Sequence, residues 1–250
     1  MKCFKIALIV ILSIFLVSFS FVFFEQNKQG LLLQLDSGEE ISIALPWREN
    51  IKSYAIGKIN EDSNNYLVTL IGSRWKKYGK EVIIYSLEDE AKEIYRKDYS
   101  ELKPWKIVIG DIDGDGMEDV SIGVYKESPL HKVMAKRPFI YSYIKGALQP
   151  KWRGSRLSRP FTDYTFHDID EDGVDEIISI EILEDNRKII NSYKWKGFGF
   201  EGYLETKDYR DIDSLSIENN EIYVQVREEK GNYWGCIRLD NNNLLLERVD

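Results

Sequence analysis

The sequence predicts an all-β protein: a β-propeller-like array of about four to five antiparallel blades, preceded by one N-terminal transmembrane helix. Three observations support this fold class. Short apolar segments separated by turn residues fill residues 31–250, an acidic loop that starts at Asp111 returns at Asp168, and a proline followed by an aromatic residue recurs. A repeat of this length with four strands in each unit is typical of propeller blades.

Alternating apolar positions and β-branched residues indicate hairpins of two kinds. Inner hairpins are expected at 53–71, 106–125, 164–183 and 212–226. Outer hairpins are expected at 31–45, 82–99, 139–152, 188–206 and 233–249. A proline-aromatic step precedes three of the inner hairpins, at Pro46-Trp47, Pro104-Trp105 and Pro160-Phe161. The prediction is therefore four blade-like units and an extra N-terminal hairpin, which could complete a blade where the ring closes.

Each acidic loop places three aspartates at alternate positions, so that three hard oxygen ligands share one side of a tight turn. A glycine allows the positive φ that the turn needs, a backbone carbonyl can add a ligand, and a later acid closes the cage. The predicted ligands are Asp111, Asp113, Asp115, Met117 and Asp119 in the first loop, and Asp168, Asp170, Asp172, Val174 and Glu176 in the second. This donor set suits Ca²⁺ better than Mg²⁺, zinc or copper. Two Ca²⁺ sites are expected.

Two other interpretations of the loops were considered. An EF-hand needs a glutamate at its twelfth position and flanking helices, whereas Ile122 and Ser179 stand there and the flanks are strand-like. A solvated acidic turn is the other alternative, and the repetition of the same ligand positions argues against it. In the first unit Lys58 replaces the first aspartate, and in the last unit the glycine is lost, so no metal is expected in either. A hairpin turn is expected at 218–221.

The two loops resemble the FG-GAP, or VCBS-type, repeat, the calcium-binding blade of integrin-α-like β-propellers. The resemblance rests on residues 109–123 and 166–177, with His167 in place of the leading glycine. It implies Ca²⁺ on four carboxylates in each loop, with carbonyl ligands from Met117 and Val174. It also implies adhesion or ligand binding rather than catalysis.

The N-terminal region carries an uncharged run from residue 6 to residue 24. At ~1.5 Å per residue it would span roughly 28 Å, close to the ~30 Å hydrocarbon core of a bilayer. Lys2 and Lys5 precede it, which keeps the N-terminus cytoplasmic. The predicted organisation is a transmembrane signal anchor at 1–24, a linker at 25–30 and an extracytoplasmic domain at 31–250, on the cell membrane with a single pass. A cleaved signal peptide is the alternative, although no small-residue cleavage pattern follows the run.

The net charge of −8 argues against general nucleic-acid binding, and two cysteines cannot form a disulfide framework. One basic segment, 151–159, could bind an anionic wall polymer or lipid headgroups; the structural alternative is that its arginines pair with nearby carboxylates. His131 and His167 lack the serine elbow of a hydrolase. A glycosidase pair could come from Asp163, Asp175 or Glu181.

We interpret the chain as a membrane-anchored, extracytoplasmic, calcium-binding module, a non-enzymatic binding or scaffold protein at the cell surface. Its expected partners are the membrane, through the N-terminal helix, and an anionic wall polymer or a protein ligand. The alternative is an enzyme that acts on a cell-wall polymer or glycan. Carboxylates from several blades gathered in one axial pocket would favour the enzyme, and an aromatic or basic face would favour binding.

Overall fold

A computed structural model describes residues 23–27, 30–34, 40–62, 64–88, 91–154 and 156–249. These residues form β-strands and one short 3-10 helix, η1 (Ser100–Leu102). The predicted all-β, propeller-like fold is confirmed. Among the residues described, no helix combines the length and the apolar character needed to cross a bilayer, and residues 1–22 of the predicted anchor lie outside the described residues.

Four antiparallel sheets of four strands each form the blades. The first blade contains β4 (Glu49–Gly57), β5 (Tyr66–Ser73), β6 (Glu81–Ser86) and β7 (Lys92–Asp98). The second contains β8 (Lys106–Gly110), β9 (Asp119–Ser128), β10 (His131–Ile144) and β11 (Ala147–Arg153). The third contains β12 (Phe161–His167), β13 (Glu176–Ile182), β14 (Lys188–Trp195) and β15 (Phe200–Glu205). The fourth contains β16 (Asp211–Glu218), β17 (Glu221–Glu228), β18 (Gly231–Asp240) and β19 (Asn243–Val249).

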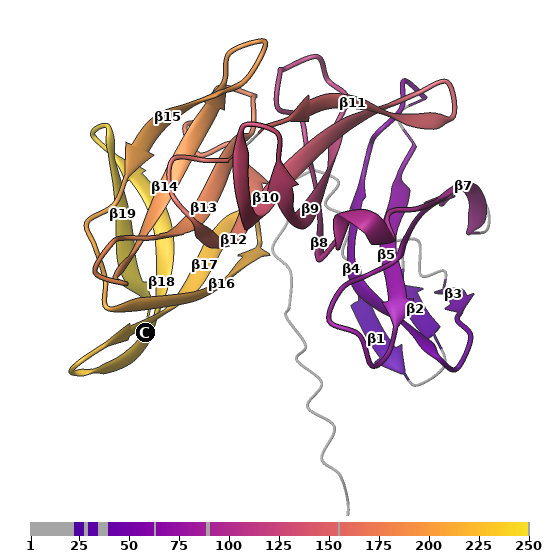
Figure 1. Ribbon diagram of the computed structural model, residues 1–250, viewed down its shortest axis with the longest axis horizontal. Coiled ribbons are helices and arrows are strands. Elements are labelled where there is room, and N and C mark those ends of the chain that lie inside the picture. The colour runs from indigo at the N-terminus through magenta and orange to yellow at the C-terminus, as the bar shows by residue number, and fades with distance from the viewer. Residues whose placement is uncertain are drawn as a thin grey trace, which may run out of the picture.

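The blades follow one another in chain order along an arc, from the purple first blade to the yellow fourth (Figure 1). The first strands of consecutive blades are neighbours, since β8 lies against both β4 and β12, and β12 lies against β16. No comparable contact joins β16 to β4 among the described residues. The inner strands therefore form a row at the centre of the arc.

Apolar side chains between the blades form the core. Val68 and Ile84 of the first blade pack with Val120 and Ile122 of the second, and similar clusters join the second blade to the third and the third to the fourth. The second strand of the third blade is covered on one face by the second blade and on the other by the fourth, which explains why β13 is buried along its length except at Ile182. Such a strand has an almost continuous apolar sequence instead of a strict alternation.

Tight hairpins join the strands where the sequence supplies turn residues. Asn219 and Asn220 have φ values of 50° and 59°, and Glu218 pairs with Glu221 across them. Two successive positive φ values are the mark of a type I′ turn, whose twist matches that of the strands. The predicted turn at 218–221 is confirmed.

An additional three-stranded sheet precedes the first blade, with β1 (Phe23–Asn27), β2 (Gly30–Gln34) and β3 (Glu40–Ala44). The predicted N-terminal hairpin corresponds to β2 and β3. It does not join the sheet of the fourth blade. Instead, Ile41 and Ile43 pack on the first blade with Leu67 and Ile83, because these apolar side chains cover a face of that blade which has no other neighbour along the arc.

Candidate metal site

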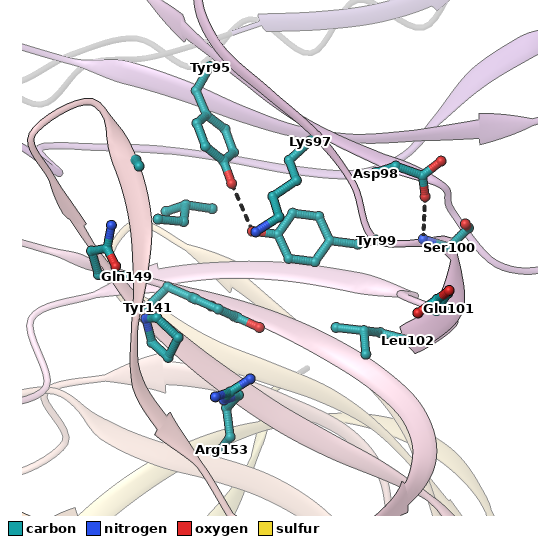
Figure 2. A pocket seen from close by; sticks show the side chains of 13 residues that line it. Tyr95, Lys97, Asp98, Tyr99, Ser100, Glu101, Leu102, Tyr141, Gln149 and Arg153 are labelled. Carbon is teal, nitrogen blue, oxygen red and sulfur yellow. Dashed lines mark hydrogen bonds between the residues drawn. The ribbon is translucent and has the colours of Figure 1, made fainter.

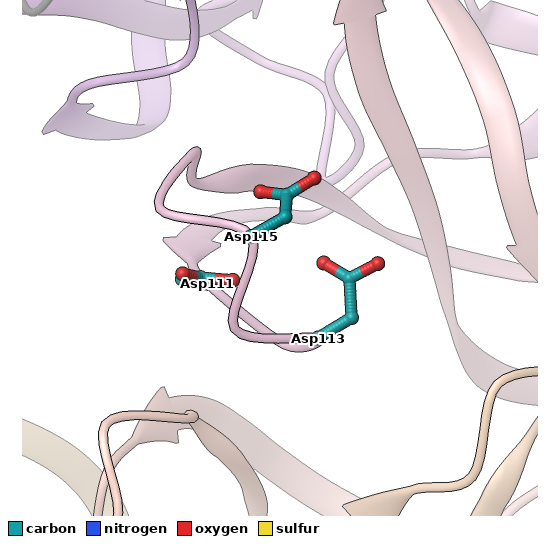
Figure 3. Close-up of side chains that lie close together, drawn as sticks. All are labelled: Asp111, Asp113 and Asp115. Carbon is teal, nitrogen blue, oxygen red and sulfur yellow. The ribbon is translucent and has the colours of Figure 1, made fainter.

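Both acidic loops join the first strand of a blade to its second. The first acidic loop (111–118) connects β8 to β9, and the second acidic loop (168–175) connects β12 to β13. Because β8 and β12 are neighbours, the two loops lie at the same end of adjacent blades. Figure 3 shows Asp111, Asp113 and Asp115 around the turn of the first acidic loop.

The leading aspartate shapes each loop by accepting backbone amides. In the first acidic loop the two carboxylate oxygens of Asp111 accept the N–H groups of Gly114 and Gly116, both at 2.8 Å. In the second, Asp168 accepts the N–H groups of Asp172 at 3.0 Å and Gly173 at 2.8 Å. Both loops therefore fold around their first aspartate in the same way.

Two acidic clusters in the described residues could hold a metal ion. In each, three carboxylate oxygens, one from every member, lie within 4.8 Å of one another. The first cluster is Asp111, Asp113 and Asp115, and the second is Asp168, Asp170 and Glu176. The remaining predicted carboxylates, Asp119 and Asp172, lie outside this spacing. The carbonyls of Met117 and Val174 stay predictions as ligands, although their N–H groups are held by Asp115 and Asp172.

The closing acids are both buried. Asp119 accepts hydrogen bonds from Ser142 and Lys151, each at 2.7 Å, and burial raises its pKa to about 6. Glu176 is fully buried, and burial raises its pKa to about 7. A divalent cation at either loop would favour the charged form and reverse these shifts.

A lysine forms ion pairs with the acids of each loop, and the sequence pattern did not predict these contacts. In the first acidic loop Lys151 of β11 lies 2.7 Å from both Asp113 and Asp119. Partial burial lowers its pKa, but hydrogen bonds to the two aspartates outweigh this and leave the pKa raised. The ammonium group thus neutralises one of the four acidic charges of Asp111, Asp113, Asp115 and Asp119, and these four acids with Lys151 keep a net charge of about −3 when all are ionised.

Lys194 of β14 has the same role in the second acidic loop. Its ammonium nitrogen lies 2.6 Å from Asp170 and from Asp172, and 3.5 Å from Glu176. Tyr193, the preceding residue, pairs with Ile177 in the sheet, which places Lys194 beside the loop. This contact comes from the third strand of the blade, beyond the reach of a local sequence motif.

The second acidic loop retains unused oxygen ligands. Among the described residues, Asp170 Oδ1 and Glu176 Oε1 are buried without a hydrogen-bond partner, although the Lys194 ammonium lies 3.5 Å from Glu176 Oε1. Buried carboxylate oxygens are seldom left without a donor or a cation, because the lost solvation is not replaced. The second acidic loop therefore fits a hard cation, and the first resembles it in fold and charge.

A reciprocal pair of hydrogen bonds, here called the inter-blade clamp, links each acidic loop to the preceding blade: an acid accepts one bond with its side chain and donates the other with its backbone N–H. Asp175 accepts the N–H group of Asp111 at 2.8 Å and donates its own N–H to the Asp111 carbonyl at 2.7 Å. One blade earlier, Glu118 accepts the N–H group of Lys58 and donates to its carbonyl at 3.0 Å. The acids just before the closing acid therefore bind the neighbouring loop and not a metal.

Each carboxylate considered for catalysis forms hydrogen bonds or ion pairs with other described residues. Asp175 is held in the inter-blade clamp. Asp163 pairs with Lys106 at 2.5 Å, and Glu181 is buried among Tyr193, Asn191, Ser179 and Arg159. His131 contacts the buried Arg137 at 3.2 Å. These side chains are occupied by structural contacts.

The four cations of the basic segment 151–159 lie in different environments. Lys151 belongs to the first acidic loop, and Arg159 pairs with Glu181 at 3.2 Å and Glu205 at 2.9 Å. Arg153 lines a cleft between the first two blades, and Arg156 is exposed. The structural alternative thus accounts for two of the four cations, and binding of an anionic partner stays a prediction.

Comparisons with known proteins support the fold. No protein-family model matches the chain, and no curated protein matches it. A crystal structure of a protein from Lactobacillus plantarum is similar with a TM-score of 0.51 and 9% identity, over 90% of this chain and 63% of that one. A structure described as a candidate 6-phosphogluconolactonase from Bacteroides uniformis matches with a TM-score of 0.49 and 11% identity, over 90% of this chain and 68% of that one. At such identities the likeness to the Lactobacillus plantarum protein shows a shared β-propeller-like fold and nothing about activity.

Proposed function

We propose that this chain is an extracytoplasmic binding module whose two acidic loops hold Ca²⁺, as in the FG-GAP and VCBS-type repeats that they resemble. The observation that carries the proposal is the buried Asp170 Oδ1, which has no hydrogen-bond partner, beside Glu176 Oε1, which faces the Lys194 ammonium at 3.5 Å. They lie in a cluster of hard oxygen ligands, which Ca²⁺ prefers. The ion would be structural, and it would neutralise the remaining charge of the loop.

Binding fits the surface better than catalysis does. Trp47 and Trp75 are 66% and 68% exposed, and their ring centroids lie 5.9 Å apart. The guanidinium of Arg48 lies over the Trp47 ring, 4.7 Å from its centroid. An exposed aromatic and basic surface is typical of interaction sites, whereas the carboxylates that an enzyme would need are held in structural contacts.

Replacement of Lys194 tests whether the second acidic loop binds a cation. The change Lys194→Met removes a positive charge that competes with the metal, and like charges ~4 Å apart repel by ~1–4 kcal/mol. Calcium affinity at this loop is expected to rise about tenfold or more, and the melting temperature in chelator is expected to fall because the acids lose their counter-ion. Isothermal titration calorimetry and thermal unfolding measure the two effects.

Lys196→Met is the matched control, since Lys196 is exposed two residues further along the same chain segment. If Lys194→Met lowers the melting temperature and calcium does not restore it, the lysine is the permanent counter-ion and the second loop is not a metal site.

The proposed location follows from the uncharged run at 6–24. The full chain is expected to remain in the membrane fraction after alkaline carbonate extraction, because an apolar run of ~20 residues inserts stably. Its N-terminus is expected to be at or near Met1. Recovery of the protein from the medium with a new N-terminus between Ser20 and Gln29 would instead identify a cleaved signal peptide.

A further inference from the structure

A cleft of about 680 Å³ lies between the first and second blades. Its lining comes from β7 and η1 of the first blade and from β10 and β11 of the second. Figure 2 shows the tyrosines and charged groups around this inter-blade cleft. Clefts of this size can enclose one or a few sugar units or a comparable small molecule.

Three tyrosines form a fixed wall of the inter-blade cleft. The Tyr95 and Tyr99 hydroxyls lie 2.9 Å apart, and Tyr99 meets Tyr141 edge-to-face with ring centroids 6.1 Å apart. Tyr99 and Tyr141 are 6% and 5% exposed, so their rings are held by the core. Burial raises the pKa of Tyr141 to about 12, so its hydroxyl is protonated at neutral pH, as that of an ordinary tyrosine also is.

Two cations complete the inter-blade cleft. Lys97 lies near the Tyr99 ring, with its ammonium 5.5 Å from the ring centroid, and Arg153 lies close enough to Tyr141 to oppose the rise in the pKa of that tyrosine. Neither cation forms an ion pair with another described residue. The two acids that line the cleft, Asp98 and Glu101, lie at or next to η1. Asp98 accepts the N–H group of Ser100 at 2.7 Å, and Glu101 is exposed.

We propose that the inter-blade cleft binds a carbohydrate that carries a carboxylate. Tyr95 is partly exposed, and a tyrosine ring offers rigid apolar surface together with a hydroxyl, which suits a sugar ring edged by hydroxyl groups. Arg153 and Lys97 supply charge-assisted hydrogen bonds for the carboxylate, and Gln149 adds an amide at the same wall. This inference rests on the proposed binding function for its purpose, and it requires no metal at the cleft.

The test uses the full chain with three probes: trigalacturonate, neutral maltotriose and tetraglutamate. Trigalacturonate is expected to bind, and Arg153→Ala and Lys97→Ala are each expected to weaken its binding about tenfold or more. Arg156→Ala is the matched control, because Arg156 is an exposed cation of the same segment outside the cleft lining, and its affinity is expected to stay within about twofold of the wild type. Equal melting temperatures verify that the variants are folded.

The proposal would be overturned by no trigalacturonate binding at millimolar concentration, by equal losses in Arg153→Ala and Arg156→Ala, or by tetraglutamate binding as tight as that of the sugar. The last result would assign the cleft to acidic peptides. Equal affinity for maltotriose and trigalacturonate would show that Lys97 and Arg153 do not recognise the carboxylates, and would likewise contradict the proposal. Calcium titration of the same preparation measures metal binding independently. A loss of carbohydrate binding at the cleft can therefore be distinguished from a lack of calcium binding at the acidic loops.

Discussion

Calcium is expected to raise the melting temperature of the full chain by roughly 6–11 °C, and chelator to reverse the effect. Each acidic loop, together with its closing acid, brings the four predicted carboxylate ligands close to a single lysine. Without a metal ion these carboxylates therefore repel one another. At calcium tenfold above Kd, each site would stabilise the folded state by about 1.4 kcal/mol, and two independent sites by roughly 3 kcal/mol. This is a sizeable share of a domain stability of ~5–15 kcal/mol.

Single substitutions separate the two sites. Asp115→Ala and Asp170→Ala, one from each acidic cluster, are each expected to remove one bound ion, measured by calorimetry. Asp62→Ala and Asp213→Ala are the controls from the degenerate loops, where Asp62 is bonded to Tyr66 and Asp213 to Arg227, and they should remove none. If no calcium binds and chelator leaves the melting temperature unchanged, Lys151 and Lys194 are sufficient counter-ions and the loops are acidic turns held by ion pairs.

Loss of the inter-blade clamp is expected to destabilise the fold without removing a predicted metal ligand. Asp175→Ala leaves the Asp111 N–H group, which Asp175 accepts at 2.8 Å, without its acceptor. A buried donor left unpaired costs about 1–3 kcal/mol. Asp175→Asn retains an acceptor oxygen and should lose less. Glu118→Ala, at the junction of the first two blades, is expected to behave in the same way because Glu118 accepts the Lys58 N–H group.

The free energy of unfolding in urea, measured in chelator, tests the inter-blade clamp. Glu184→Ala serves as the control, since Glu184 is exposed at the opposite turn of the third blade, and its effect should stay within about 0.5 kcal/mol. Equal unfolding free energies for Asp175→Ala and Glu184→Ala would mean that the inter-blade clamp contributes nothing measurable to stability.

Local chemistry made much of this architecture predictable from the sequence. Hairpins depend on neighbouring residues, so the alternation of apolar side chains identified the paired strands, and Asn219-Asn220 identified a turn that needs two positive φ values. The acidic loops are equally local, because Asp111 and Asp168 organise backbone amides only a few residues away. A local pattern could not show that the N-terminal hairpin packs on the first blade.

Contacts between strands and blades were decided by the tertiary structure. Lys151 lies at a β-bulge, where Ile140 pairs with Trp152 and Tyr141 with Pro150. A bulge inserts an extra residue and redirects its side chain, so the regular alternation of β11 does not predict that Lys151 reaches the first acidic loop. The inter-blade clamp of Asp175 likewise exists only when two blades are packed together. The sequence by itself thus determined the strands and the acidic loops. The packing of strands and blades decided which lysines neutralise the loops and which acids link one blade to the next.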